Sequence, residues 1–167
     1  MLARAPQQMT DHLQALIARC RAEHACKPGA SAEEIQATEL RIGFPFTPEL
    51  RELLQACNGI DFWATGNYPC RLLSLQEMVA ARDYLSTDDG PPGLIALLAA
   101  ESDCVAIGLD RAHASCGRIV DCSHETFPCE LSGVCDSLQD MLALVLDSGD
   151  EEWIWPAACG CGVDYAT

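Results

Sequence analysis

The sequence contains no lysine or arginine after Arg118. Residues 119–167 carry ten acidic side chains and no basic ones, so they contribute −10 to the net charge of −15. This shortage argues against direct binding of nucleic acid, because contacts to phosphate rely on Lys and Arg. An acidic protein instead suits a basic protein partner, since opposite charge speeds their encounter. The competing interpretation is that the charge serves solubility alone.

Long apolar runs and enzyme signatures are also missing. The longest apolar run, Leu94 to Ala100, has the length of a strand and is too short to cross a membrane. Residues 1–14 show no sustained apolar core of a secretory signal, so we expect a cytoplasmic protein that is not attached to a membrane. The chain has no Gly-rich phosphate loop, no G-x-S-x-G and no H-E-x-x-H motif. We therefore expect neither an enzyme nor a bound cofactor.

Cysteine, in contrast, is abundant, with 11 in the chain. Because the number is odd and no export signal is visible, we expect most of them to be reduced and packed as small apolar side chains. The densest set of possible zinc ligands comprises Cys116, Cys122, Cys129, Cys135, His113 and His124. Their spacing lacks the close Cys-x-x-Cys pairs of structural zinc sites, and Cys159-Gly-Cys161 stands alone, so we expect no metal site. A Cys-rich metal-binding or thiol-redox module remains a weaker alternative.

The length and composition indicate one globular domain, with 49% hydrophobic and 21% charged residues. The spacing of apolar residues predicts helices over 9–22, 31–42, 47–57 and 74–85, and a closing helix from 136. It predicts strands over 60–63, 71–73, 94–100, 104–109 and 117–122, with a further short strand within 123–135. Helices at both ends of a run of strands are typical of an α+β domain. We expect residues 148–167 to form an extension packed on it.

The stretch from Ser31 to Gly59 carries the strongest local signals. Ser31 and Glu34 have the spacing of a capping box, which begins a helix. Gly43 suits the left-handed residue that ends this helix, and Pro45 keeps the following chain extended. Thr47 then caps the next helix, whose first turn tolerates the proline that follows. The stretch therefore predicts two short helices joined by a fixed turn.

This pattern resembles the SMI1/KNR4 (SUKH) family. The family shows a helix, then G-F-P-(apolar)-(P or T)-P, an acidic residue, a second helix with two leucines, and N-G. The matching positions are Gly43, Phe44, Pro45, Phe46, Thr47, Pro48, Glu49, Leu53, Leu54, Asn58 and Gly59. The order of elements agrees over roughly residues 9–147, and the resemblance implies a mostly antiparallel sheet flanked by helices, in a single domain over 1–167.

The resemblance also implies a function. SUKH relatives typically protect a bacterium from a cognate toxin, often a nuclease, by binding it and blocking its active site. We therefore expect an immunity protein with a basic toxin as its partner. The alternative is a regulatory, protein-binding module of the same fold that has no toxin, as the eukaryotic relatives suggest.

A contact surface for such a partner is predicted from aromatic residues in a loop and from clustered acids. Aromatic anchors surrounded by an acidic rim suit a basic protein. The candidate partner-binding residues are Asp61, Phe62, Trp63, Tyr68, Glu101, Asp103, Asp110, Asp121, Glu125, Asp150, Glu151, Glu152, Trp153 and Trp155. For any single residue, the plainer interpretation is that aromatics pack in the core and acids face solvent.

Overall fold

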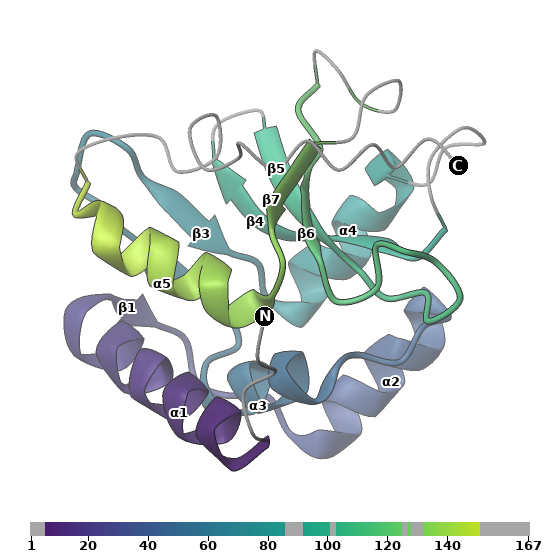
Figure 1. Ribbon diagram of the computed structural model, residues 1–167, viewed down its shortest axis with the longest axis horizontal. Coiled ribbons are helices and arrows are strands. Elements are labelled where there is room, and N and C mark those ends of the chain that lie inside the picture. The colour runs from purple at the N-terminus through teal and green to yellow at the C-terminus, as the bar shows by residue number, and fades with distance from the viewer. Residues whose placement is uncertain (1–5, 86–91, 101–102, 125–126, 128–131, 151–167) are drawn as a thin grey trace.

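The computed structural model describes residues 6–85, 92–100, 103–124, 127 and 132–150, apart from the side chains of 6–10, 83 and 84 (Figure 1). Within them lie five helices and seven strands. In chain order these are α1 (Pro6–Glu23), β1 (Ala25–Cys26), α2 (Ala32–Ile42), α3 (Pro48–Ala56), β2 (Ile60–Phe62), β3 (Cys70–Leu72), α4 (Leu75–Leu85), β4 (Leu94–Ala100), β5 (Asp103–Gly108), β6 (Ile119–Asp121), β7 (Ser132–Cys135) and α5 (Leu138–Ser148). None of these helices is long and apolar enough to span a membrane.

The strands form one sheet in the order β1-β2-β3-β4-β5-β6-β7, and every strand pairs antiparallel with its neighbour along the chain. In Figure 1, α5 lies on the viewer's side of the sheet, with α1 running below it, and α4 packs against β4. The expected α+β class, with an antiparallel sheet flanked by helices, is confirmed.

The core fills the space between the sheet and the helices. Its largest fully buried side chains include Phe46 and Leu53 from the helical half and Leu72, Ile95 and Leu97 from the sheet. Continuous apolar runs such as β4, six of whose seven residues are buried, need cover on both faces. Burying this surface is the main favourable term in folding.

The two-helix stretch folds as its sequence predicts. The Ser31 hydroxyl accepts a hydrogen bond from the Glu34 amide at 3.2 Å, and the Glu34 carboxylate accepts one from the Ser31 amide at 2.8 Å. Gly43 ends α2 with φ of 88°, and the Thr47 hydroxyl accepts from the Leu50 amide at the start of α3. All of these signals act within a few residues, which explains why the sequence reveals them.

A buried carboxylate fixes the angle between these two helices. Glu39, on α2, is 9% exposed. It accepts a hydrogen bond from the Phe46 amide at 2.7 Å and two from the Arg51 guanidinium, at 2.8 and 2.9 Å. The turn and α3 are thereby both tied to α2 through one side chain. The sequence analysis did not single out Glu39, because its partners lie 7 and 12 residues further along the chain.

Some element boundaries differ from the prediction. The sequence predicts no strand between the helices expected over 9–22 and 31–42, but Ala25 and Cys26 form β1 by pairing with Asp61 and Ile60. A two-residue strand has no sequence periodicity of its own and is defined only by its partner. The short strand expected within 123–135 is present as β7. The expected packing of the C-terminal extension falls largely on 151–167, outside the described residues.

The described cysteines are free thiols. Cys20, Cys57, Cys70, Cys104 and Cys122 are buried, as expected for side chains that pack as small apolar groups. Burial raises the pKa of Cys20 and of Cys70 to about 12 in each case. Such thiols stay protonated at neutral pH and react slowly.

Replacement of Glu39 by Gln is expected to lower the free energy of unfolding by about 2 kcal/mol, because charge-assisted hydrogen bonds to a buried carboxylate would be lost. Denaturant unfolding followed by circular dichroism measures this. Glu33→Gln, at an exposed position in the first turn of α2, serves as the control and should change stability by at most about 0.5 kcal/mol. Equal effects of the two substitutions would show that Glu39 does not fix the turn.

Candidate partner-binding edge

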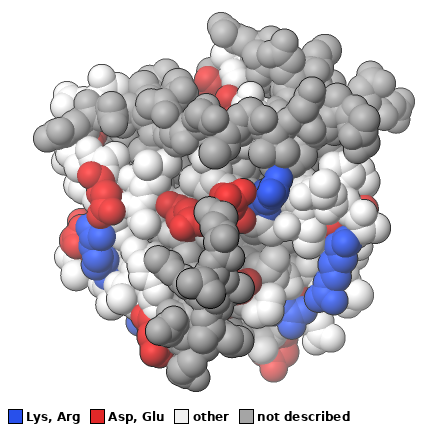
Figure 2. All heavy atoms as spheres, viewed as in Figure 1, with Lys and Arg blue, Asp and Glu red and all other residues white. Residues whose placement is uncertain are grey.

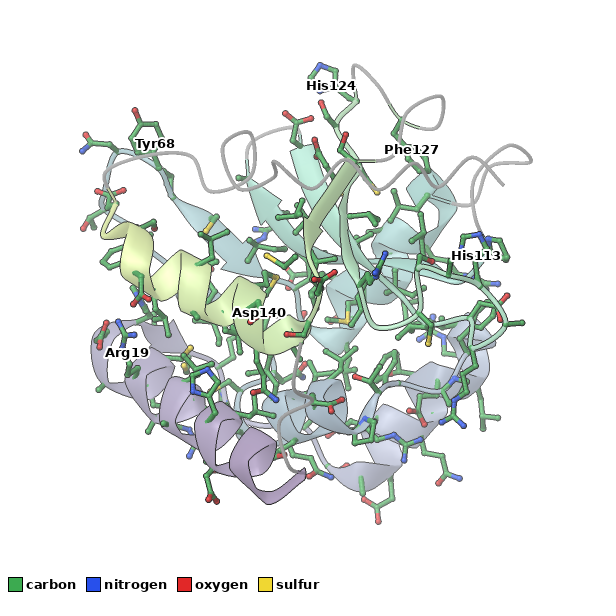
Figure 3. The ribbon with its side chains drawn as sticks, viewed as in Figure 1. Arg19, Tyr68, His113, His124, Phe127 and Asp140 are labelled. Carbon is green, nitrogen blue, oxygen red and sulfur yellow. The ribbon has the colours of Figure 1, made fainter. Side chains whose placement is uncertain are left out.

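The pairing of the strands brings most of the candidate residues that the structure describes to one end of the sheet. Asp61 lies opposite Arg71, Ala100 lies opposite Asp103, and Val105 lies opposite Asp121. Because the strands alternate in direction, the end of β2, the start of β5 and the end of β6 meet at this end. We call this row of strand ends the turn edge. It is defined by Asp61, Trp63, Tyr68, Asp103, Asp121, His124 and Asp150. Tyr68 and His124 both lie along the top of Figure 3.

Two candidates do not contribute a contact at the turn edge. Asp110 follows the opposite end of β5, and the five residue steps from Asp103 to Gly108 span about 17 Å of strand. Phe62 is fully buried. Alternation along β2 places Ile60 and Phe62 on the core side and leaves Asp61 on the other. Phe62 is therefore a core residue, and the expectation that it is an exposed aromatic anchor is corrected.

An aromatic cluster of His24, Phe62 and Trp63 packs beside the turn edge. The His24 ring packs edge-to-face against Phe62, with ring centroids 5.0 Å apart, and against Trp63 at 4.4 Å. Burial lowers the pKa of His24, so its ring is neutral at pH 7. The sequence analysis missed His24, because only the pairing of β1 with β2 brings it beside these rings.

Trp63 itself is held in an unusual conformation. Its φ of 51° is left-handed, which is rare for a bulky residue. Its indole Nε1 is buried and has no hydrogen-bond partner among the described residues. Buried donors are nearly always satisfied, and strained backbone tends to occur at functional positions. Both features make Trp63 the strongest aromatic candidate at the turn edge.

Asp150 holds the loop between β2 and β3. Its two carboxylate oxygens accept hydrogen bonds from the Asn67 amide at 2.8 Å and the Tyr68 amide at 2.7 Å. Gly66 makes room for this contact, since a Cβ there would lie 2.1 Å from Asp150 Oδ2. The sequence analysis treated Asp150 as a contact for a partner. Its geometry makes it a positioning residue, because both oxygens are engaged within the chain.

Asp103 and His124 form a pair at the top of the sheet. His124 Nδ1 lies 2.8 Å from Asp103 Oδ1, which also accepts from the His124 amide at 3.0 Å. Burial acts to raise the pKa of Asp103, but the hydrogen bonds from His124 and Ser123 outweigh it and the pKa is lowered. Asp103 is therefore ionised at neutral pH.

Asp121 lies in a less favourable setting. Burial and then the charge of Asp103 raise its pKa, and its Oδ1 is buried without a hydrogen-bond partner among the described residues. An ionised carboxylate held under these conditions costs stability. A perturbed acid of this kind is more frequent at functional sites than elsewhere.

Most described basic side chains form ion pairs with acidic side chains. Arg19 pairs with Glu23 and Asp147, Lys27 and Arg71 pair with Glu77, Arg51 pairs with Glu39, and Arg118 pairs with Asp136. Figure 2 shows acidic groups in the middle of the visible face, over the start of α5 near Asp140, with one basic group beside them. Neutralised cations leave the acidic excess to dominate the field around the protein.

The suggested zinc ligands are dispersed. Cys116 forms an isolated backbone β-bridge with Gly108, at the end of β5. Cys135 lies opposite Ile119, the first residue of β6, whereas Cys122 follows the last residue of that strand. His113 contacts Ser115 instead. The described residues contain no group of three or more His, Cys, Asp or Glu side chains placed to hold a metal ion.

Several candidates lie outside the described residues. These are Glu101, Glu125, Glu151, Glu152, Trp153 and Trp155, together with Cys129, Cys159 and Cys161. In sequence, the candidates among them flank described residues of the turn edge: Glu101 precedes Asp103, Glu125 follows His124, and the others follow Asp150.

Residues 29–144 match the model of the SMI1 / KNR4 family (SUKH-1), which is more than half of the chain. The chain belongs to the SUKH-1 family. The resemblance drawn from the two-helix stretch is thereby confirmed, and the match covers every turn-edge residue except Asp150. No curated protein matches the SUKH-1 chain.

Replacement of Asp121 by Asn is expected to stabilise the protein at pH 7. The raised pKa means that the folded state holds the Asp121 proton more tightly than the unfolded state, so stability is lost as the pH rises through that pKa. Asn cannot ionise, so the variant does not lose this stability as the pH rises. The gain should be about 0.5 kcal/mol, small because the side chain is only half-buried, and should vanish in acid, below the pKa of an unfolded Asp.

Unfolding by denaturant at several pH values measures the effect of Asp121→Asn. The control, Asp110→Asn, removes the same charge at the opposite end of β5 and retains the Oδ1 that accepts from the Ala112 amide. A destabilised Asp121→Asn variant at pH 7 would contradict the assignment.

Replacement of Asp150 by Asn is expected to loosen the loop between β2 and β3. Asn tolerates the left-handed φ of 63°, but its NH₂ group would face one of the two loop amides. Hydrogen exchange at the Asn67 and Tyr68 amides should become about tenfold faster. Asp147→Asn, which affects an exposed pair with Arg19, is the control and should leave both rates unchanged. Protection that persists in Asp150→Asn would rule out this positioning role.

Proposed function

We propose that this SUKH-1 protein is an immunity protein that binds a cognate bacterial toxin and neutralises it. The proposed toxin has a basic effector domain of the nuclease type, and binding occludes its active site. The observation that carries the proposal is the turn edge: strained and half-buried Trp63 lies at the same end of the sheet as Asp61, Asp103 and Asp121, in a chain whose family is SUKH-1. The proposed role places the protein in the cytoplasm.

The chemistry of a nuclease explains why such an edge would inhibit it. An active-site groove that holds a phosphate backbone is lined with Lys and Arg. Carboxylates presented by another protein can take the place of phosphates in that groove. The net charge of −15 would also steer the two proteins together and raise the rate of association.

Aromatic residues would supply the affinity that charge alone does not. Tyr and Trp side chains are enriched among the residues that dominate binding energy, and they act best when rigidly held. Trp63 is fixed by its packing on His24, and the loop that carries Tyr68 is fixed by Asp150. A rigid loop loses little entropy when a partner binds.

The alternative of a regulatory module without a toxin uses the same surface and differs only in the partner. The thiol-redox alternative concerns the cysteines of the C-terminal third of the chain. It receives less support from Cys122, because burial raises the pKa of that thiol.

Co-expression with the proteins encoded beside this chain in its genome tests the proposal. One of them should stop growth when expressed alone, and growth should return when this chain is expressed with it. Purified together, the two should form a stable complex. If no neighbouring protein is both toxic and bound, the immunity function is rejected and the regulatory alternative is favoured.

Reversal of charge next to the turn edge should slow association with that toxin. We expect Glu151→Lys/Glu152→Lys to reduce the association rate about tenfold at low salt and to flatten its dependence on salt, since steering is electrostatic. The matched control, Glu33→Lys/Glu49→Lys, makes the same change of charge in the first turns of α2 and α3. Surface plasmon resonance at several salt concentrations compares them. Equal rates for the two variants would place the interface elsewhere.

A further inference from the structure

A pocket of about 340 Å³ opens at the turn edge, beside the loop that joins β2 to β3. Its volume falls within the range of about 300–1,000 Å³ that is usual for pockets that bind small ligands. The described residues that line it come from β2, β3, β4 and the loop, and are Asp61, Phe62, Ala64, Pro69, Cys70, Arg71, Ala99 and Ala100.

The register of the sheet explains the shape of this pocket. Asp61, Arg71 and Ala99 lie opposite one another on three neighbouring strands and therefore share one face of the sheet. Ala99 and Ala100 are small, which leaves space where larger side chains would fill the surface. Pro69 and Cys70 add further apolar surface. The lining therefore combines polar and apolar surface in similar amounts, and it contains one acidic and one basic side chain.

The basic side chain of the pocket, Arg71, forms an ion pair with Glu77 rather than with Asp61. Arg71 Nε lies 3.5 Å from Glu77 Oε1, at the start of α4. Glu77 is itself held in place, because its Oε2 accepts hydrogen bonds from the Ser74 amide and hydroxyl and pairs with Lys27. Arg71 therefore does not neutralise its cross-strand neighbour. Within the described part of the chain, the Asp61 carboxylate takes part in no ion pair or hydrogen bond.

A carboxylate that has no partner among the described residues, placed in a pocket of mixed polarity, determines what the pocket can accept. An apolar side chain would strip water from Asp61 and give it no compensating partner. An anion would be repelled by Asp61 and by Asp150, which lies close enough to Cys70 to add to the effect of burial in raising the pKa of that thiol. A cation with an apolar stem meets both requirements, since the stem covers the apolar walls and the charge reaches the acid.

We propose that the pocket receives an arginine side chain of the protein partner, with its guanidinium on the Asp61 carboxylate. Arginine fits better than lysine, because its planar fork forms two parallel hydrogen bonds with a carboxylate and it loses less hydration on burial. This inference rests on the proposed function, which supplies a basic partner. It adds one specific anchor to the general attraction of an acidic edge.

Nuclear magnetic resonance of the full-length protein tests the pocket directly, without knowledge of the partner. The probe is Nα-acetyl-arginine N-methylamide, and the control probe is the citrulline analogue, which has the same shape and no charge. The arginine probe should shift the amide signals of Asp61, Arg71 and Ala99 in a saturable way. The affinity of the citrulline probe should be at least about tenfold lower, as expected for the loss of a hydrogen bond between charged groups.

Two substitutions in the pocket should act in opposite directions. Asp61→Asn keeps the shape and should weaken binding of the arginine probe about tenfold. Arg71→Gln removes a repelling charge and should strengthen it about twofold, since the charge is partly screened by solvent. Asp110→Asn, at the opposite end of the sheet, is the matched control and should bind as the unaltered protein does. Neither pocket substitution touches the core, so folding should be retained in both.

The outcomes separate the pocket from the proposed function. If the chain neutralises a toxin but the arginine probe gives no saturable shift, or Asp61→Asn binds it normally, the pocket is overturned and immunity stands. If the probe binds as expected but no neighbouring protein is toxic and bound, the arginine pocket stands and the immunity function fails. Self-association of the protein that Asp61→Asn abolishes would identify a second copy as the occupant and would overturn the proposal.

Discussion

An unbroken antiparallel sheet, in which each strand pairs with the next along the chain, is the constraint on which the turn edge depends. In such a sheet every second connection returns to the same side, so the ends of β2, β4 and β6 lie along one end of the sheet. Residues that are 60 positions apart in the sequence, such as Asp61 and Asp121, are thereby placed at one edge. The helices supply the buried surface that makes this sheet stable, and Glu39 fixes how two of them meet.

The turn edge holds features that lower stability. Trp63 has a left-handed backbone and a buried indole donor for which the described residues supply no partner, and Asp121 is a half-buried acid next to Asp103. A protein retains such features when the surrounding structure over-determines them. Here the surroundings are well-packed strands whose residues are almost all buried. Within the described residues, the non-glycine residues with positive φ are Trp63 and Asp150, both at the turn edge, which supports the proposal that this edge binds the partner.

The acids of the turn edge have different tasks. Asp150 uses both oxygens to hold loop amides, and Asp103 is paired with His124. Asp61 has no such partner in the described part of the chain, although Arg71 lies directly across from it. Sequence alone gives these three the same weight, as acids near aromatic residues. Their contacts divide them into two residues that hold neighbouring groups and one, Asp61, to which we assign the proposed arginine.

The sequence by itself determined the elements whose signals are local. The capping box at Ser31, the left-handed Gly43 and the apolar runs of β4 and β5 act within a few residues, so the helices, the strands and the SUKH-1 resemblance could be predicted. Tertiary structure alone decided the rest. The pairing that makes β1 a strand, the burial of Phe62, and the bonds of Asp150 to amides 82 and 83 residues away depend on distant segments meeting. Local propensity carries no information about which distant segment arrives, because that is set by packing of the whole chain.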